Sequence, residues 1–252
     1  MLNIVIPMAG RGTRFVKAGY SSPKPLIPVH GKPMIQVVID NLRPRQAHRF
    51  IFICQQQHLD QYGLGQKLHA WAPGCQVIPV SRVTDGAACT VLLAREIITT
   101  ADPLMIANCD QYVDVSINDY LARMETNQLD GLIMTMTADD PKWSFLQLDA
   151  RGLVTEVVEK KVVSNEATVG IYNYRTGASF VAAAEAMIAN DLRVNNEFYV
   201  APAYNEMIAT GSRIGIYNVG SDRKGMYGLG VPEDLDYFLS LPALVAKTVE
   251  PL

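Results

Sequence analysis

Cationic side chains gather in the loop that follows the first apolar run of the chain. The segment PMAGRGTRFVKAGYSSPKPLIPVHGKPM, residues 7–34, carries Arg11, Arg14, Lys17 and Lys24 around two closely spaced glycines. Glycine lets the backbone approach a ligand closely, and successive amide N–H groups in such a loop can cradle phosphate oxygens. The formal net charge of the chain is −3, so these cations are a local concentration. The segment therefore predicts a phosphate-binding loop.

Lys24 stands between two prolines in SPKPL. Proline fixes φ, lacks a backbone donor and pushes the preceding residue toward extended conformations. We therefore expect Lys24 on a stiff, non-helical segment, where its charge can meet one particular oxygen. Two familiar phosphate motifs are excluded. The G-x-G-x-x-G fingerprint fails because Phe15 replaces its third glycine, and the P-loop pattern fails because Pro33 follows Gly31 and Lys32.

Alternating strands and helices must position this loop. Residues 2–8 form a near-continuous apolar run, which predicts a buried strand. Similar patterns predict strands at 49–54, 76–80 and 103–108 and helices at 33–42, 57–70 and 87–98. Such alternation is typical of a mainly parallel sheet covered on both faces. Loops at the carboxyl ends of parallel strands line the ligand crevice of such a sheet, and residues 9–32 would be one of them.

The second half of the chain is richer in strand patterns. We expect strands at 131–138, 144–150, 153–160 and 168–175, followed by helices at 177–190 and 232–240. Turn signals separate the strands, so the second half predicts mixed or antiparallel additions to the sheet.

The composition describes an ordinary globular protein. The chain has 252 residues, of which 49% are hydrophobic and 19% are charged. Its slight negative charge argues against nucleic acid or an anionic membrane as a partner. Without a secretory signal pattern or an apolar stretch of about 20 residues, we expect a cytoplasmic protein. The spacing of the 4 cysteines and 4 histidines indicates neither a zinc site nor disulfides.

A combined motif resembles the signature loop of a known enzyme family. AGRGTRF, the ten-residue spacing from Arg14 to Lys24, and PKPLIPVHGKPMI together resemble the loop of the sugar-phosphate nucleotidyltransferases, or NDP-sugar pyrophosphorylases. The resemblance implies a single α/β domain over residues 1–240, Rossmann-like and of the GT-A type, with a C-terminal tail over 241–252. It implies that Arg14 holds the β and γ phosphates of an NTP and that Lys24 stabilises charge at the reacting phosphorus. Further nucleotide contacts are expected from Ala9, Gly10, Gly12 and Thr13.

A carboxylate at a later strand end is the expected metal ligand. Phosphoryl transfer normally needs a divalent cation that bridges phosphate oxygens. Asp110 follows the strand at 103–108, where the family's metal-binding aspartate lies, so we expect Mg²⁺ there. The family commonly carries a second aspartate in W-x-D-x-G-T-P-E-D, but this chain reads YGLGVPED and has Gly228 at that position. Glu197 and Asp222 are the candidates to replace it, and the alternative is an enzyme that uses its metal differently.

Three further segments resemble substrate-binding segments of the family. TDGAACTVLLA resembles the segment that lines the nucleobase pocket, which implies base contacts at Gly86 and Ala87. VVEKK resembles the segment in which a glutamate bonds sugar hydroxyls and a lysine neutralises the acceptor phosphate. VGIYNY resembles the strand that follows it. The predicted acceptor-binding residues are Glu159, Lys160, Gly170 and Glu197.

The resemblance implies an enzyme that transfers NMP from an NTP to a phosphorylated acceptor, a sugar 1-phosphate, and releases pyrophosphate. Its product would be a precursor for capsule or lipopolysaccharide. Two alternatives remain: a cytidylyltransferase for a phosphorylated non-sugar, and a non-catalytic regulatory subunit that binds nucleotide sugar. A glycosyltransferase would need D-x-D at a strand end, and NCDQYVD does not supply it. A homo-oligomer is left open, because the apolar faces of the late helices suit either subunit contacts or core.

Overall fold

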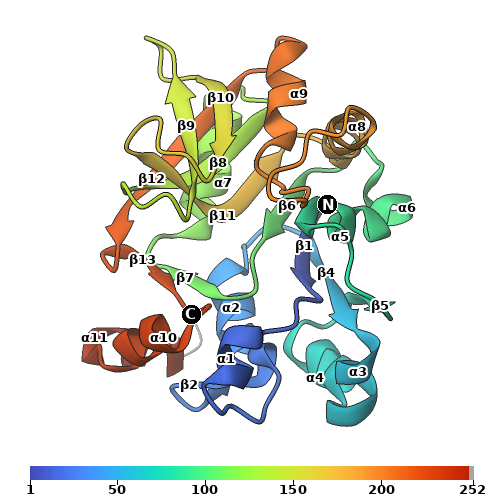
Figure 1. Ribbon diagram of the computed structural model, residues 1–252, viewed down its shortest axis with the longest axis vertical. Coiled ribbons are helices and arrows are strands. Elements are labelled where there is room, and N and C mark those ends of the chain that lie inside the picture. The colour runs from blue at the N-terminus through green and yellow to red at the C-terminus, as the bar shows by residue number, and fades with distance from the viewer. Residues whose placement is uncertain (250–252) are drawn as a thin grey trace.

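An eleven-stranded mixed sheet forms the centre of the computed structural model, which describes residues 1–249 (Figure 1). Strand β1 (Leu2–Met8) runs parallel to β4 (His48–Gln55) on one side and to β6 (Leu104–Ala107) on the other. Strand β5 (Gln76–Val80) extends the parallel part beyond β4. The predicted parallel arrangement of the first half is confirmed, and the carboxyl ends of β1, β4 and β6 share one edge.

Helices cover both faces of the sheet. Side chains alternate between the two faces along each strand, so both faces carry apolar residues against which helices pack. Ile4 and Ile6 of β1 belong to one apolar cluster, and Val5 between them belongs to the other. The first cluster includes buried residues of α2 (Met34–Leu42), α4 (Leu64–Trp71) and α7 (Ile117–Thr126). The second includes buried residues of α5 (Ala87–Val91), α8 (Gly177–Ala189) and α9 (Ala203–Ala209).

Strand β11 (Glu166–Tyr174) joins the two halves of the sheet. It runs antiparallel to β6 and to β8 (Gly131–Thr137), and β12 (Ile214–Asp222) then runs parallel to β8. A hairpin of β9 (Ser144–Leu148) and β10 (Val154–Glu159) attaches to β11. The predicted mixed and antiparallel additions are therefore confirmed.

Two short strands form one edge of the sheet, and two others form a hairpin outside it. Strand β7 (Gln111–Val113) pairs with β13 (Gly225–Gly228), and β2 (Pro28–Val29) pairs with β3 (Lys32–Pro33) in a separate small hairpin. In Figure 1 the β9–β10 hairpin lies at the top of the molecule. Helices α1 (Thr13–Lys17), α10 (Pro232–Leu239) and α11 (Pro242–Val249) lie in the lower part of the view, as does α4.

Two helices predicted as continuous are broken. The helix expected over 57–70 is divided into α3 (Gln56–Tyr62) and α4, because Gly63 takes a left-handed conformation with φ +58. The helix expected over 87–98 becomes α5, a 3₁₀ turn and α6 (Arg95–Ile98). The elements that were not predicted include the helices α7 and α9 and the strand β12.

The C-terminal segment is a packed helix in its described part rather than a tail. Leu244 of α11 is buried in the same apolar cluster as Leu235 and Phe238 of α10. Lys247 of α11 donates to the Asp114 carboxylate at 2.6 and 2.8 Å. Residues 250–252 of the predicted tail lie outside the described residues. Within 1–249, no helix combines the length and apolar character needed to cross a bilayer.

Candidate active site

A side chain from β4 holds the loop that leaves β1. Gln55, the last residue of β4, donates through Nε2 to the carbonyl oxygens of Ala9 and Gly10, at 2.9 Å each. The parallel register that pairs Met8 with Cys54 brings Gln55 level with the start of this loop. The predicted phosphate-binding loop therefore starts from a defined point at the carboxyl edge of the sheet.

Gly12 brings the loop against Lys24. Its backbone is left-handed, with φ +60, and an added Cβ would lie 3.2 Å from the Cβ of Lys24. Glycine meets both the conformational and the steric requirement at this position. Helix α1 begins immediately afterwards at Thr13, and Arg14 in its first turn is exposed.

The segment that carries Lys24 is stiff but not fully extended. Pro23 is extended, whereas Lys24 begins a 3₁₀ turn in which the Leu26 amide donates to the Pro23 carbonyl at 2.8 Å. The prediction of a non-helical Lys24 was wrong, because proline is tolerated in the first turn of a helix, where its missing donor has no partner to lose. Pro25 is buried, so it anchors the turn.

An ion pair joins the predicted catalytic lysine to the predicted metal ligand. The Lys24 ammonium donates to Oδ2 of Asp110, and the exposed fractions of the two side chains are 20% and 24%. Burial has the largest single effect on the pKa of Lys24 and favours the neutral amine, but the charge of Asp110, its hydrogen bond with Lys24 and the neighbouring Cys109 together raise this pKa. The positive charge of the Arg14 guanidinium lowers the pKa of Lys24 and so opposes the effect of Asp110. Lys24 and Asp110 therefore lie together, and Arg14 belongs to the same loop, two residues after the Gly12 that packs against Lys24.

A glycine segment after β13 passes over Asp110. The Leu229 amide donates to the Asp110 carbonyl at 2.8 Å, and an added Cβ on Gly230 would overlap Oδ2 of Asp110. Mg²⁺ is commonly bound by one or two carboxylates together with phosphate oxygens and water. Asp110, beside a lysine at the end of the predicted phosphate-binding loop, fits this mode of coordination.

No carboxylate stands at position 228. Gly228 pairs with Gln111 in the β13–β7 ladder, next to Asp110. An added Cβ on Gly228 would lie 3.2 Å from Oδ2 of Asp234, whose Oδ1 accepts a 3.0 Å hydrogen bond from Arg223. In the described part of the chain, no three His, Cys, Asp or Glu side chains are grouped to hold a metal.

The two candidates for a second metal ligand have partners elsewhere. Asp222 lies 4.0 Å from the Lys142 ammonium. The pKa of Lys160 is raised mainly by its hydrogen bond with Tyr199, which acts against burial, and the charge of the nearby Glu197 adds a smaller increase. These contacts give no support to a role for either carboxylate beside Asp110.

Gly86 is required by a neighbouring backbone. Its φ is +128, and an added Cβ would lie 2.5 Å from the amide nitrogen of Phe198. Phe198 donates to the Asp85 carbonyl at 2.8 Å and accepts from the Ala88 amide at 3.0 Å. The backbone that approaches Gly86 closely, and so requires glycine there, is therefore that of Phe198. Contacts of Gly86 and Ala87 with a nucleobase stay a prediction.

Three of the predicted acceptor-binding residues form one cluster. Glu159 ends β10 opposite Ser144, whose hydroxyl donates to Oε2 of Glu159. Burial raises the pKa of Glu159 despite this hydrogen bond. The Lys160 ammonium donates to Oη of Tyr199 at 2.5 Å. Glu197 lies close enough to influence the charge of both Glu159 and Lys160.

Gly170 positions the turn that leads to Asp110. Its φ is +82, and an added Cβ would overlap Nδ2 of Asn108 and lie 2.8 Å from Oε1 of Gln111. The Asn108 amide donates to the Gly170 carbonyl at 3.0 Å. Gly170 is thus packed against the Asn108–Gln111 turn, and its contact with an acceptor stays a prediction.

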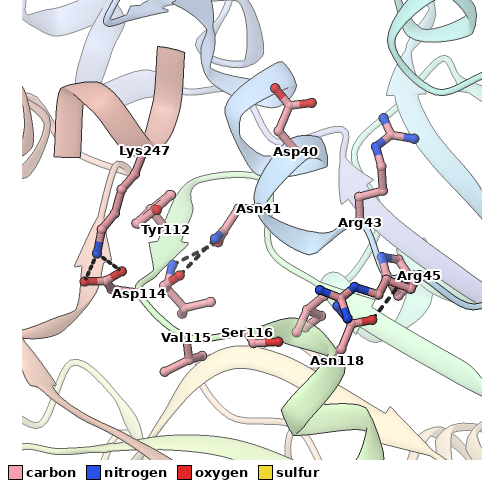
Figure 2. A pocket seen from close by; sticks show the side chains of 13 residues that line it. Asp40, Asn41, Arg43, Arg45, Tyr112, Asp114, Val115, Ser116, Asn118 and Lys247 are labelled. Carbon is pink, nitrogen blue, oxygen red and sulfur yellow. Dashed lines mark hydrogen bonds and ion pairs between the residues drawn. The ribbon is translucent and has the colours of Figure 1, made fainter. Parts of the chain in front are cut away.

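A separate pocket of about 580 Å³ lies between α2, β7, α7 and α11 (Figure 2). Asn41 exchanges hydrogen bonds of 2.8 and 2.9 Å with the Val113 backbone in its wall, and Lys247 pairs with Asp114 at 2.6 Å. None of the residues predicted for the site lines this pocket. It is therefore distinct from the candidate active site.

Sequence reasoning missed several residues that hold the site. Gln55 had a local signal, because it is the polar residue that ends an apolar strand. Tyr199 had a weak one, since it stands two residues after Glu197 in NNEFY. Its contact with Lys160 joins positions 39 residues apart, which no local pattern reveals.

The chain belongs to the nucleotidyl transferase family, whose model it matches over residues 4–201. It is 32% identical over 168 residues to the bifunctional protein GlmU of Burkholderia orbicola (strain MC0-3), across 66% of this chain. That alignment spans 35% of GlmU, about a third of the relative's length. The predicted family is confirmed.

Solved structures show the same fold. The nucleoside-diphosphate-sugar pyrophosphorylase from Vibrio cholerae RC9 superposes with a TM-score of 0.82 at 24% identity, covering 94% of this chain and 100% of that chain. The inositol-1-phosphate CTP transferase from T. maritima superposes with a TM-score of 0.73 at 14% identity, covering 99% and 97%. The predicted Rossmann-like nucleotidyltransferase fold is confirmed.

Proposed function

We propose that this protein transfers NMP from an NTP to a phosphorylated acceptor, with a sugar 1-phosphate as the favoured class, and releases pyrophosphate. The observation that carries the proposal is the Lys24–Asp110 ion pair beside the glycine loop at the carboxyl edge of the sheet. A lysine and a carboxylate together suit a triphosphate and its divalent cation. Membership of the nucleotidyl transferase family supports it.

The chain supplies charge and position to the reaction. An oxygen of the acceptor phosphate attacks the α-phosphorus in line, and a new P–O bond forms. The bond from the α-phosphorus to the oxygen that bridges it to the β-phosphorus breaks, and its electron pair leaves with pyrophosphate. Lys24, whose raised pKa keeps it charged, stabilises the α-phosphoryl oxygens, and Arg14 stabilises the leaving group. The acceptor phosphate is already ionised at neutral pH, so no protein base or covalent intermediate is required.

Asp110 is the residue that would hold Mg²⁺. The cation, when bound, neutralises charge on the phosphate oxygens. Lys24 is bonded to Asp110 in the free protein, so triphosphate binding exchanges that partner for a phosphate oxygen. Since Gly228 offers no second carboxylate, phosphate oxygens and water would complete the coordination.

The acceptor would bind at the cluster formed by the ends of β9 and β10 and the segment before α9. Glu159 would accept hydrogen bonds from acceptor hydroxyls, and Lys160 would neutralise the acceptor phosphate, with Glu197 beside them. A product of this kind is an activated precursor for a surface polysaccharide.

A matrix of substrates tests the proposal directly. Each of the four common NTPs is incubated with Mg²⁺ and a panel of sugar 1-phosphates and phosphorylated non-sugars, and pyrophosphate is measured. We expect release with at least one pair. No release with any pair would favour the non-catalytic subunit.

Two variants link the activity to the site. We expect Lys24→Ala and Asp110→Asn to lower turnover by about 100-fold or more, because each removes a charge contact made in the transition state. Lys67→Ala is the matched control, since Lys67 is an exposed lysine on α4 whose ammonium donates to the Tyr62 backbone carbonyl. Turnover close to wild type in Asp110→Asn would remove Asp110 from the reaction.

A cytidylyltransferase for a phosphorylated non-sugar is the second candidate. Gly228 favours it, because the chain departs there from the aspartate common in the sugar-phosphate enzymes. The same matrix separates the two candidates: activity confined to CTP and non-sugar phosphates would establish the second.

A further inference from the structure

Lys160 has an unusual backbone for a residue with a side chain. It directly follows β10 with φ +56, in the left-handed region. Its amide donates to the Trp143 carbonyl at 3.0 Å. Strain of this kind persists only where the surroundings hold it, and it is concentrated at ligand sites. The direction in which Lys160 leaves the hairpin is therefore fixed.

Tyr199 restrains the charged end of Lys160. The ammonium donates to Oη of Tyr199 at 2.5 Å and lies 4.7 Å from the centroid of the ring. A long lysine side chain loses considerable rotamer freedom when held in this way. The ammonium of an exposed lysine is thus confined to one position.

A tight turn presents Tyr199. Val194 and Glu197 exchange backbone hydrogen bonds of 3.0 and 2.9 Å, and Asn195 and Asn196 between them have φ +50 and +62. Two positive φ values are typical of a type I′ turn, for which asparagine is well suited. The sequence VNNE therefore folds into a rigid turn immediately before Phe198 and Tyr199.

Phe198 connects the same segment to residues 85–88, which include the predicted nucleobase contacts Gly86 and Ala87. It exchanges backbone hydrogen bonds with Asp85 and Ala88, and Gly86 leaves space for it. The Arg193 guanidinium lies 4.5 Å from the centroid of the Phe198 ring. The consecutive residues 197–199 therefore connect the predicted nucleobase contacts at Gly86 and Ala87 to Lys160.

We propose that Tyr199 is a positioning residue that holds Lys160 for the phosphate of the acceptor. Phe198 sets the distance between Lys160 and the segment around Gly86 that is predicted to contact the nucleobase. The inference rests on the proposed function, because it takes Lys160 as the ligand of the acceptor phosphate. Removing the Tyr199 hydroxyl should weaken acceptor binding and leave nucleotide binding unchanged. A purely structural contact between β10 and this segment would not produce that difference.

Tyr199→Phe tests the proposal by kinetics, with the NTP and acceptor pair that the substrate matrix selects. The variant keeps the aromatic ring and loses only Oη. We expect the acceptor KM to rise at least about 5-fold, with kcat and the NTP KM within about 2-fold of wild type. Tyr237→Phe is the matched control, because the Arg223 guanidinium lies over the Tyr237 ring at 4.6 Å. An acceptor KM within about 2-fold of wild type would overturn the proposal.

Chemical labelling of Lys160 tests the contact without turnover. Acetic anhydride modifies the neutral amine, and the Tyr199 hydrogen bond is the main cause of the raised pKa of Lys160. In Tyr199→Phe we expect Lys160 to be acetylated at least about 3-fold faster than in wild type at pH 9, relative to the exposed Lys67 of α4. Inorganic phosphate at tens of millimolar is the probe of the anion site, and it should protect Lys160 in wild type more than in the variant.

The outcomes separate the inference from the function on which it rests. Absence of pyrophosphate release by wild type rejects the proposed function, and phosphate protection of Lys160 then decides the inference. Equal protection of wild type and variant would overturn it. Faster acetylation with an unchanged acceptor KM would reduce the contact to a structural role and also overturn it.

Discussion

Replacing Gly230 with alanine tests whether the position of Asp110 governs the reaction. Gly230 does not have a positive φ, so alanine is compatible with its backbone. The added Cβ would stand 2.4 Å from Oδ2 of Asp110, whereas ordinary contacts begin at 3.4 Å. The carboxylate oxygen must therefore move by about 1 Å, away from the place where it meets the Lys24 ammonium.

The expected cost falls on catalysis rather than on folding. A misplacement of about 1 Å can lower a rate about 100-fold, which equals about 2.7 kcal/mol of transition-state stabilisation. The displaced atom is the end of a side chain that is 24% exposed and can rotate. The free energy of unfolding should therefore fall by less than about 1 kcal/mol.

Turnover and stability are measured together. The kcat for pyrophosphate release and the urea unfolding curve are compared among wild type, Gly230→Ala and the control Gly65→Ala. A Cβ on Gly65 would meet only Cδ2 of Leu59, at 3.8 Å. A kcat of Gly230→Ala within about 3-fold of wild type, with the fold intact, would refute the reasoning.

Two further predictions concern stability and thiol chemistry. Gly86→Ala should lower the free energy of unfolding by about 2 kcal/mol or more, since it combines φ +128 with overlap on the Phe198 backbone. Gly74→Ala, with φ +80 and open space, should cost about 1 kcal/mol in the same urea titration, and equal losses would show that the Phe198 contact is unimportant. Burial raises the pKa of Cys54 to about 12 and that of Cys109 to about 11. Both thiols should therefore resist a disulfide reagent at pH 8 in the native protein and react in denaturant; rapid native reaction at either would contradict their burial.

Local patterns were sufficient for the elements that form the framework of the site. The apolar run of β1 and the break at Gly10 and Gly12 are properties of neighbouring residues, so the loop and its charge could be predicted. Asp110 was predicted in the same way, as a carboxylate shortly after the apolar strand β6. Helix ends were less accurate: Gly63 interrupts a helical pattern that otherwise continues through it.

The reasons for particular residues depend on contacts across the fold. Gly86 looked like a residue that admits a base, but the backbone that approaches it belongs to Phe198, far along the chain. Lys160 looked like an isolated cation, but Tyr199 holds it. Such contacts have no signature in the local sequence, because they arise only when separate strands and loops pack together.

The chain's own order of residues therefore specifies the glycine-rich cationic loop, the alternation of strands and helices, and the family to which they belong. The pairing of Lys24 with Asp110 is a property of the folded sheet, because the parallel strands β1 and β6 bring their carboxyl ends to one edge. Backbone conformation and hydrophobic periodicity act over a few residues, whereas a charged site requires segments 86 residues apart to meet.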